Sequence, residues 1–270
     1  MKVIAVVKAR NERENISETI MSLKKQTLPL EQIIVINDGS IDGTGELARK
    51  LGCVVIDLPY HEESYVGDRP ELAERLNIGL KVAIKDNPDC LLTLDADHPL
   101  PEDYVKSLVT RMEVNAELVV VSGYIKGEPY VKTHPRGSGR LIRTSFWRKV
   151  SDVQYPVCWG WESWLRYKAM QLGYKARCFR DVESETTRPT KLGKTGYGKA
   201  MYALGYDWKY VIGRCVLTFL KSPKSGWNMF WGWVLHKDVK RLEIADWVNQ
   251  MQKNMFWKRV KAIIKRGGRK

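Results

Sequence analysis

The chain has 270 residues, 44% of them hydrophobic, so it is long enough to bury a sizeable core and too apolar for wholesale disorder. Its formal net charge is +14. From residue 221 onwards 13 Lys and Arg face three acidic residues, which gives +10 and leaves +4 for the first 220. The five cysteines form no Cys-x-x-Cys pair, which favours reduced, buried thiols in a cytosolic protein.

Targeting and membrane-spanning segments are not expected. The N-terminal apolar run is interrupted by Lys8 and Arg10, unlike that of a signal peptide. No run reaches the roughly 20 apolar residues that a transmembrane helix needs. We therefore expect a cytoplasmic protein.

Short apolar runs alternate with helical periodicities, which predicts an α/β fold with a doubly wound, mainly parallel sheet. Beyond residue 123 the pattern loosens into loops expected at 123–139 and 183–198, and the chain is then expected to be helical to its end. The expected strands cover 3–7, 32–36, 53–58, 90–94, 118–122 and 175–179, and the expected helices about 16–26, 46–51, 72–83, 101–114 and 162–172.

Two aspartates end one of these apolar runs. Asp95 and Asp97 follow residues 90–94 in a Leu-Asp-Ala-Asp-His segment. Ligands of open α/β sheets bind at the carboxyl ends of the strands. Carboxylate oxygens one residue apart suit a divalent cation that is shared with a diphosphate. Taken alone, however, the pair is better explained as an acidic turn that starts the next helix.

Polar residues also follow the first two strands. Asp38 lies in Asn-Asp-Gly-Ser-Ile-Asp-Gly-Thr, where glycines let the backbone approach a ligand closely. A tight turn capped by Asp42 or Thr44 also explains this segment. The first strand ends in Ala-Arg-Asn-Glu at 9–12. Three polar strand ends at one sheet edge favour a nucleotide-type site.

In combination these segments resemble the family 2 inverting glycosyltransferases with the GT-A fold. The resemblance covers roughly residues 1–180 and rests on Val-Val-Lys-Ala-Arg-Asn-Glu, Ile-Ile-Val-Ile-Asn-Asp-Gly-Ser, Asn77-Ile-Gly79 and Leu-Asp-Ala-Asp. It implies a GT-A nucleotide-sugar-binding and catalytic domain over 1–180, followed by an acceptor loop and a basic amphipathic helical region over 181–270.

The resemblance also implies roles for the three aspartates. Asp38 is expected to contact the base, Asp95 to lie near the ribose, and Asp97 to bind Mg²⁺ or Mn²⁺ on the diphosphate, with Asp95 as a second candidate metal ligand. His98 and His134 are weaker candidates, because a lone histidine is more often a polar surface residue.

Two positions depart from the family pattern. Asn37 replaces the first acidic residue, and Leu76 stands where an arginine often precedes Asn-x-Gly. Arg69 and Arg75 are therefore the candidates for base recognition. The other expected donor-binding residues are Ala9, Asn11 and Glu12.

Inverting transfer needs a general base, because the acceptor hydroxyl loses its proton as it attacks. The family supplies the second residue of a Glu-Asp pair, eleven residues before a Gly-Tyr. Glu162 occupies that position, with Trp161 before it and Gly173-Tyr174 after it. A surface ion pair with Arg166, four residues further along one helix, is the alternative.

Aromatic residues gather around this acid and in the basic tail. Trp159, Trp161 and Trp164 are either an acceptor platform or core. Residues 222–270 combine apolar stripes with cations, which favours peripheral contact with an anionic membrane. A purely structural alternative is that this region forms two helices packed on the catalytic domain, with a solvated basic end. Nucleic-acid binding is a third interpretation.

The sequence therefore predicts a metal-dependent inverting glycosyltransferase of the hexosyltransferase type. It would transfer a sugar from a nucleotide-sugar donor to a glycan or lipid-linked acceptor at the inner membrane face. The alternatives are a non-catalytic nucleotide- or glycan-binding module and a nucleic-acid-binding protein that uses the basic tail.

Overall fold

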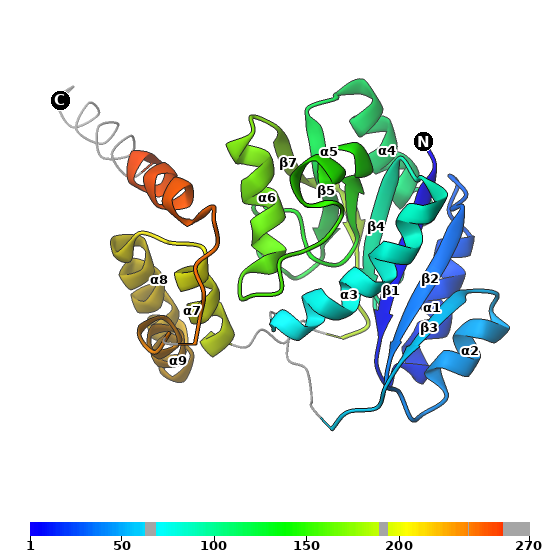
Figure 1. The fold of residues 1–270 in the computed structure, drawn as a ribbon, viewed down its shortest axis with the longest axis horizontal. Coiled ribbons are helices and arrows are strands. Elements are labelled where there is room, and N and C mark those ends of the chain that lie inside the picture. The colour runs from blue at the N-terminus through cyan, green and yellow to red at the C-terminus, as the bar shows by residue number, and fades with distance from the viewer. Residues whose placement is uncertain (63–68, 189–193, 237, 256–270) are drawn as a thin grey trace. The chain divides into compact units, whose positions relative to one another are not determined.

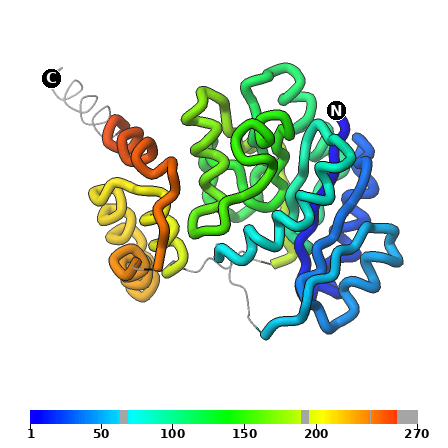
Figure 2. Tube along the Cα trace, viewed as in Figure 1, coloured from blue at the N-terminus to red at the C-terminus, as the bar shows by residue number. Residues whose placement is uncertain are grey.

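A computed structural model of the chain describes residues 1–62, 69–188, 194–236 and 238–255. These residues form two compact units, which are described separately. Figure 2 traces the chain through both. The described residues of the first unit are 1–62, 71–156 and 168–188, and those of the second are 69–70, 157–167, 194–236 and 238–255.

The first unit is built on a seven-stranded sheet in the order β3-β2-β1-β4-β6-β5-β7 (Figure 1). Only β6 runs antiparallel to its neighbours, so the predicted mainly parallel sheet is confirmed. The strands are β1 Val3–Ala9, β2 Gln32–Asp38, β3 Val54–Leu58, β4 Cys90–Asp95, β5 Leu118–Ile125, β6 Arg140–Arg143 and β7 Lys175–Ser184.

Helices cover both faces of this sheet, because its central strands are apolar on both sides. Val3, Ala5 and Val7 of β1 belong to the core cluster that α1 and α4 complete. On the opposite face α3 approaches closely at Gly79, where an added Cβ would meet Val6 Cγ1 at 2.8 Å. The helices and the 3₁₀ turn η1 are α1 Arg13–Lys24, α2 Thr44–Lys50, α3 Pro70–Ala83, η1 Ile84–Asp86, α4 Tyr104–Val114 and α5 Thr144–Ser151. Helix α6, Trp161–Gln171, has residues 161–167 in the second unit and 168–171 in the first.

The strand order reverses direction beside β1. The chain adds β2 and then β3 on one side of β1, and later adds β4 on the other side. Such a topological switch point leaves a crevice at the carboxyl ends of the two adjacent strands. The polar residues that follow β1 and β4 therefore lie where this class of sheet binds ligands.

The structure corrects the expected loops. Directly after the predicted loop 123–139 the chain forms β6 and then α5, neither of which the sequence predicted. The predicted loop 183–198 is also too long, because β7 continues to Ser184 and α7 begins at Lys194. The part of that loop at 189–193 lies outside the described residues.

The described C-terminal part of the second unit is helical, as predicted. Asp207 caps the start of α8 by accepting from the backbone N–H of Lys209 at 3.1 Å, and Pro223 opens α9. No helix within the described ranges is long and apolar enough to cross a membrane. The helices are α7 Lys194–Ala203, α8 Trp208–Lys221, α9 Pro223–Val234 and a stretch over 245–255; residues 256–270 of the predicted basic tail lie outside the described residues.

Candidate active site

The polar ends of β1, β2 and β4 meet at one edge of the sheet. Lys8 lies opposite Asp95 in the β1–β4 register, and Ala9 lies opposite Asn37 in the β1–β2 register. Asp38 is the last residue of β2. Because the side chain of Ala9 is buried, only its backbone is available to a ligand. The predicted gathering of these strand ends is therefore present.

Asp95 is held by a cation and by a hydroxyl group. Lys8 Nζ lies 2.9 Å from Asp95 Oδ1, and the Asp95 backbone N–H donates to Ser138 Oγ at 2.9 Å. Burial acts to raise the pKa of Asp95, but the charge and hydrogen bond of Lys8 outweigh it, so the net pKa is lowered. With its side chain 36% exposed, Asp95 is an ionised carboxylate that reaches solvent.

His98 ties the end of β4 to β7. It is fully buried, with Nδ1 2.7 Å from Ser138 Oγ and Nε2 2.9 Å from Ser184 Oγ. Burial lowers the pKa of His98 to about 4. Both ring nitrogens are occupied by protein contacts, so we do not propose His98 as a metal ligand.

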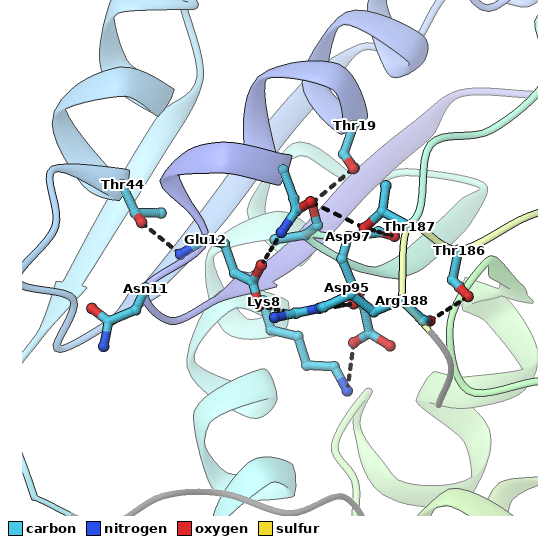
Figure 3. A network of polar contacts seen from close by, with 12 residues as sticks. Lys8, Asn11, Glu12, Thr19, Thr44, Asp95, Asp97, Thr186, Thr187 and Arg188 are labelled. Atoms are coloured by element: carbon cyan, nitrogen blue, oxygen red, sulfur yellow. Dashed lines mark hydrogen bonds and ion pairs between the residues drawn. The ribbon is translucent and has the colours of Figure 1, made fainter. Parts of the chain in front are cut away.

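Asp97 and Glu12 share one guanidinium group (Figure 3). Arg188 Nε donates to Asp97 Oδ2 at 3.0 Å, and Arg188 Nη2 donates to Glu12 Oε1. The backbone N–H of Thr187 donates to the carbonyl of Asp97 at 2.9 Å, and its hydroxyl donates to Asn15 Oδ1 at 3.1 Å. The segment that follows β7 is therefore fastened to the end of β4 and the start of α1.

This carboxylate pair fits a divalent cation. The side chains of Asp97 and Glu12 are only 19% and 13% exposed, and both carboxylates converge on the positive charge of Arg188. Carboxylate oxygens are the ligands that Mg²⁺ and Mn²⁺ take. Within the described part of the chain no three His, Cys, Asp or Glu residues are grouped to hold a metal. Water and substrate phosphates would supply the remaining ligands, as is usual for Mg²⁺.

Asp38 is a buried carboxylate with two nitrogen partners. Arg75 Nε lies 2.8 Å and His61 Nε2 3.2 Å from Asp38 Oδ1. Of the two arginines that the sequence offered for base recognition, Arg75 therefore contacts the base-binding candidate. Arg69 belongs to the second unit, where its carbonyl accepts from Trp161 Nε1 at 3.1 Å.

Two asparagines shape the loops around Asp38. Asn11, with a positive φ of 51°, donates its backbone N–H to Ser40 Oγ and accepts from the backbone N–H of Ile41, both at 3.0 Å. Asn37 donates to Asp57 Oδ1 at 2.8 Å. A carboxylate at position 37 would repel Asp57, which gives a local reason for this departure from the family pattern.

Glu162 lies in the first turn of α6, in the second unit, and is partly buried. Gly160, with φ of 84°, starts this turn by accepting backbone hydrogen bonds. Arg166 is buried with its guanidinium 4.0 Å from the ring centroid of Tyr167. Burial acts to lower the pKa of Arg166, but Tyr167 and Tyr206 outweigh it and raise that pKa. The general-base role of Glu162 and its pairing with Arg166 both stay predictions.

Two of the three candidate acceptor tryptophans are buried. Trp161 and Trp164 are 2% and 3% exposed, and Trp164 Nε1 donates to Glu243 Oε1 at 2.8 Å. Their burial favours the core alternative over an acceptor platform. Trp159 is half-buried with Lys199 Nζ 5.3 Å from a ring centroid, so it is the member that stays a candidate.

Sequence reasoning missed three cationic or basic partners at this site. Lys8 carried a signal, since it is a charged residue near the end of an apolar strand. His61 and Arg188 carried none, because their partners lie far away in the chain: Arg188 contacts Asp97 across 91 positions. Only the folded chain brings such residues together.

Comparison with known proteins identifies the family. Residues 4–173 match the family described as Glycosyl transferase family 2, and the chain belongs to this family. Polyprenol monophosphomannose synthase of Mycolicibacterium smegmatis is 27% identical over 128 residues, which cover 47% of this chain and 46% of that protein. Dolichol-phosphate mannosyltransferase of Pyrococcus furiosus is 26% identical over 164 residues, which cover 58% of this chain and 44% of that protein. The chain thus spans less than half the length of either relative.

A solved structure shares the GT-A fold. The mannosyltransferase PcManGT from Pyrobaculum calidifontis, in complex with GDP-Man and Mn²⁺, matches with a TM-score of 0.60 at 15% identity. The match covers 92% of this chain and 78% of that one. At this level of identity the likeness establishes the fold alone.

Proposed function

We propose that this protein is a metal-dependent, inverting glycosyltransferase that moves a hexose from a nucleotide sugar to an acceptor hydroxyl. The observation that carries the proposal is the convergence of Asp97 and Glu12 on one cation at the β1–β4 switch point. The buried Asp38 ends the neighbouring strand β2. Membership of glycosyl transferase family 2 supports the reaction class.

The nucleoside half of the donor is assigned to the ends of β2 and β4. Asp38, oriented by Arg75, would accept hydrogen bonds from the N–H groups of the base. Asp95, held by Lys8, would accept from the ribose hydroxyls. Both roles need ionised carboxylates, and the lowered pKa of Asp95 supplies one.

The diphosphate half is assigned to Asp97. Asp97 would hold Mg²⁺ or Mn²⁺, with Asp95 and Glu12 as the neighbouring carboxylates. When bound, the metal neutralises the charge that develops on the leaving diphosphate. Arg188 already provides a positive charge at this position, beside the two shielded carboxylates.

The acceptor half is assigned to Glu162. Its carboxylate would take the proton of the acceptor hydroxyl while that oxygen forms a bond to the anomeric carbon. The bond from that carbon to the diphosphate breaks on the opposite face, and the nucleoside diphosphate leaves with the electron pair. Attack opposite the leaving group inverts the anomeric configuration.

Two substitutions test these assignments. Asp97→Asn and Glu162→Gln should each lower transfer from UDP-, GDP- or dTDP-sugars with Mn²⁺ by at least about 100-fold, since a positioned base alone contributes about 10²–10⁴-fold. Asp181→Asn and Glu113→Gln remove similar acids from exposed ion pairs and serve as controls. Thermal unfolding should show that all four variants fold. Near-normal turnover of either site variant would remove that residue from the mechanism.

The transfer assay, together with a DNA-shift assay, separates the transferase from a nucleotide- or glycan-binding module and from a nucleic-acid-binding protein. A wild-type protein that binds nucleotide sugar with metal, and neither transfers nor hydrolyses it, is a binding module. A protein that shifts DNA in a salt-dependent way and ignores nucleotide sugars is a nucleic-acid binder. Loss of activity in EDTA and its recovery with Mn²⁺ supports the transferase.

We further propose that the acceptor is lipid-linked and that the protein works as a peripheral protein at the cytoplasmic face of a membrane. The net charge of +14 supports attraction to anionic lipid. The names of two relatives, a polyprenol and a dolichol-phosphate enzyme, support a lipid acceptor. Transfer to polyprenyl phosphate in vesicles, compared with transfer to soluble sugars, tests this choice.

A further inference from the structure

Helices α8 and α9 form a tight hairpin within the second unit. A single residue, Ser222, separates them, and an added Cβ on Gly226 of α9 would meet Phe219 Cα of α8 at 2.5 Å. Gly232 lies equally close to the backbone of α7, where its Cβ would meet the carbonyl of Thr195. This close packing fixes the inner face of the hairpin and leaves the outer face of α8 uncovered.

That outer face is unusually apolar. Of the 14 residues of α8 only Val211 and Cys215 are buried. Figure 1 shows α8 beside α9 in this unit. A surface helix normally turns polar residues outwards, so a continuous apolar exposure indicates an interaction surface. The hairpin surface is defined here by five apolar side chains that are more than half exposed: Trp208, Val216, Leu217, Leu220 and Trp227.

The charges on the same hairpin have one sign. Residues 208–234, which form the hairpin, contain no Asp or Glu and four cations, Lys209, Arg214, Lys221 and Lys224. All four are exposed. Apolar and aromatic side chains interleaved with cations are the composition of a helix that lies in the interface of an anionic bilayer.

This pattern argues against a second copy of the chain as the occupant. In a two-fold dimer the same patch faces itself, so cations would meet cations without an acidic residue of the patch to pair with them. An anionic leaflet supplies both the apolar volume and the negative charge. At 14 residues α8 is too short to cross a bilayer, which leaves an orientation in the membrane plane.

Part of the tail that the sequence predicted as the membrane contact is buried in the structure. Ile244 and Val248, two members of the apolar stripe predicted within 222–270, are fully buried in the second unit. These two side chains therefore serve packing within this unit. The exposed apolar surface begins earlier, at Trp208.

We propose that the α8–α9 hairpin surface is the site that binds this protein to an anionic lipid bilayer, with its cations at the headgroups and its indoles and leucines at the acyl boundary. The inference extends the membrane-surface part of the proposed function and supplies its contact. It is independent of the assignments at the sheet edge.

Flotation with phosphatidylcholine vesicles that contain 30% phosphatidylglycerol tests the proposal. The wild-type protein should float at low salt and less at high salt, and should not float with phosphatidylcholine alone. Lys221→Gln/Lys224→Gln should lower partitioning about 25-fold, because each cation near such a surface contributes about fivefold. Leu217→Ser/Leu220→Ser should lower it at least about tenfold.

Matched variants control for charge and hydrophobicity. Lys50→Gln/Lys106→Gln removes two exposed cations from the first unit, and Val114→Ser removes an apolar side chain that is 84% exposed on α4. These controls should float as the wild type does. Because the changed side chains are exposed, circular dichroism melting should be the same for all variants.

The outcomes separate this proposal from the proposed function. Hairpin variants that lose flotation but keep transfer to a soluble acceptor support the site, and Asp97→Asn should float normally without activity. Absent flotation, flotation that persists in both hairpin variants, or a concentration-dependent dimer that the leucine variants abolish would each overturn it. A DNA shift that depends on Lys221 and Lys224 without vesicle binding would also overturn it.

Discussion

Removal of the Arg188 guanidinium should strengthen metal binding. In the structure Arg188 donates to both Asp97 and Glu12, the two shielded carboxylates at the proposed metal position. A metal ion that binds there competes with this cation. Arg188→Gln keeps most of the side-chain volume and removes the competing charge.

The magnitude follows from two ion pairs that share one half-exposed side chain. Arg188 is 55% exposed, so each pair is worth the 0.2–1 kcal/mol typical of exposed pairs rather than the value of a buried one. Two such pairs amount to about 0.5–2 kcal/mol. At about 1.4 kcal/mol per tenfold change, the dissociation constant for Mn²⁺ should fall about 2- to 30-fold.

Isothermal titration calorimetry with Mn²⁺, without nucleotide, measures this effect directly. Arg111→Gln is the matched control, because Arg111 pairs with Asp181 away from the strand ends. The free energy of unfolding of Arg188→Gln should decrease in the absence of metal, since Asp97 and Glu12 then lack their shared cation. An unchanged or weaker Mn²⁺ affinity would refute the assignment of this position to the metal.

Three further predictions concern packing, base binding and thiol reactivity. Gly79→Ala should lower the free energy of unfolding in urea by about 1–3 kcal/mol, because its Cβ would meet a β2 side-chain carbon at 2.6 Å. Gly213→Ala should raise it by up to about 1 kcal/mol, because a Cβ at this position of helix α8 meets open space. Asp38→Asn should weaken nucleotide binding about tenfold or more in calorimetry and leave Mn²⁺ binding unchanged; an equal loss of both would contradict a base-specific role. Burial raises the pKa of the Cys53 and Cys90 thiols to about 11 and 12. In the native protein these thiols should react with DTNB slowly at pH 8, and their reaction rate should rise about tenfold for each pH unit. In the unfolded chain all five thiols should react at once.

The three central parallel strands were predictable because each is apolar on both faces. β1, β2 and β4 appear in the sequence as continuous apolar runs, and each run ends in polar residues. That local pattern was enough to place Asp38, Asp95 and the polar residues after β1 at one edge of a sheet. The resemblance to a family added roles that periodicity alone does not supply.

The antiparallel strand was not predictable from local pattern. β6 has four residues with an arginine at each end, and its Leu141 pairs with Leu92 of β4 and Val121 of β5. Arg140 is nonetheless buried, with its Nε donating to the carbonyl of Arg136 at 2.8 Å. A strand this short is stabilised by its neighbours on both sides rather than by its own composition.

The sequence by itself determined the alternation of strands and helices as far as β5, and with it the edge at which the acidic residues gather, because periodicity and strand ends are local properties. Only the tertiary structure decided that Arg188 contacts Asp97, that Arg75 rather than Arg69 contacts Asp38, and that Trp161 and Trp164 are buried. These features depend on pairings between distant residues, and such pairings exist only once loop closure and packing have brought the segments together.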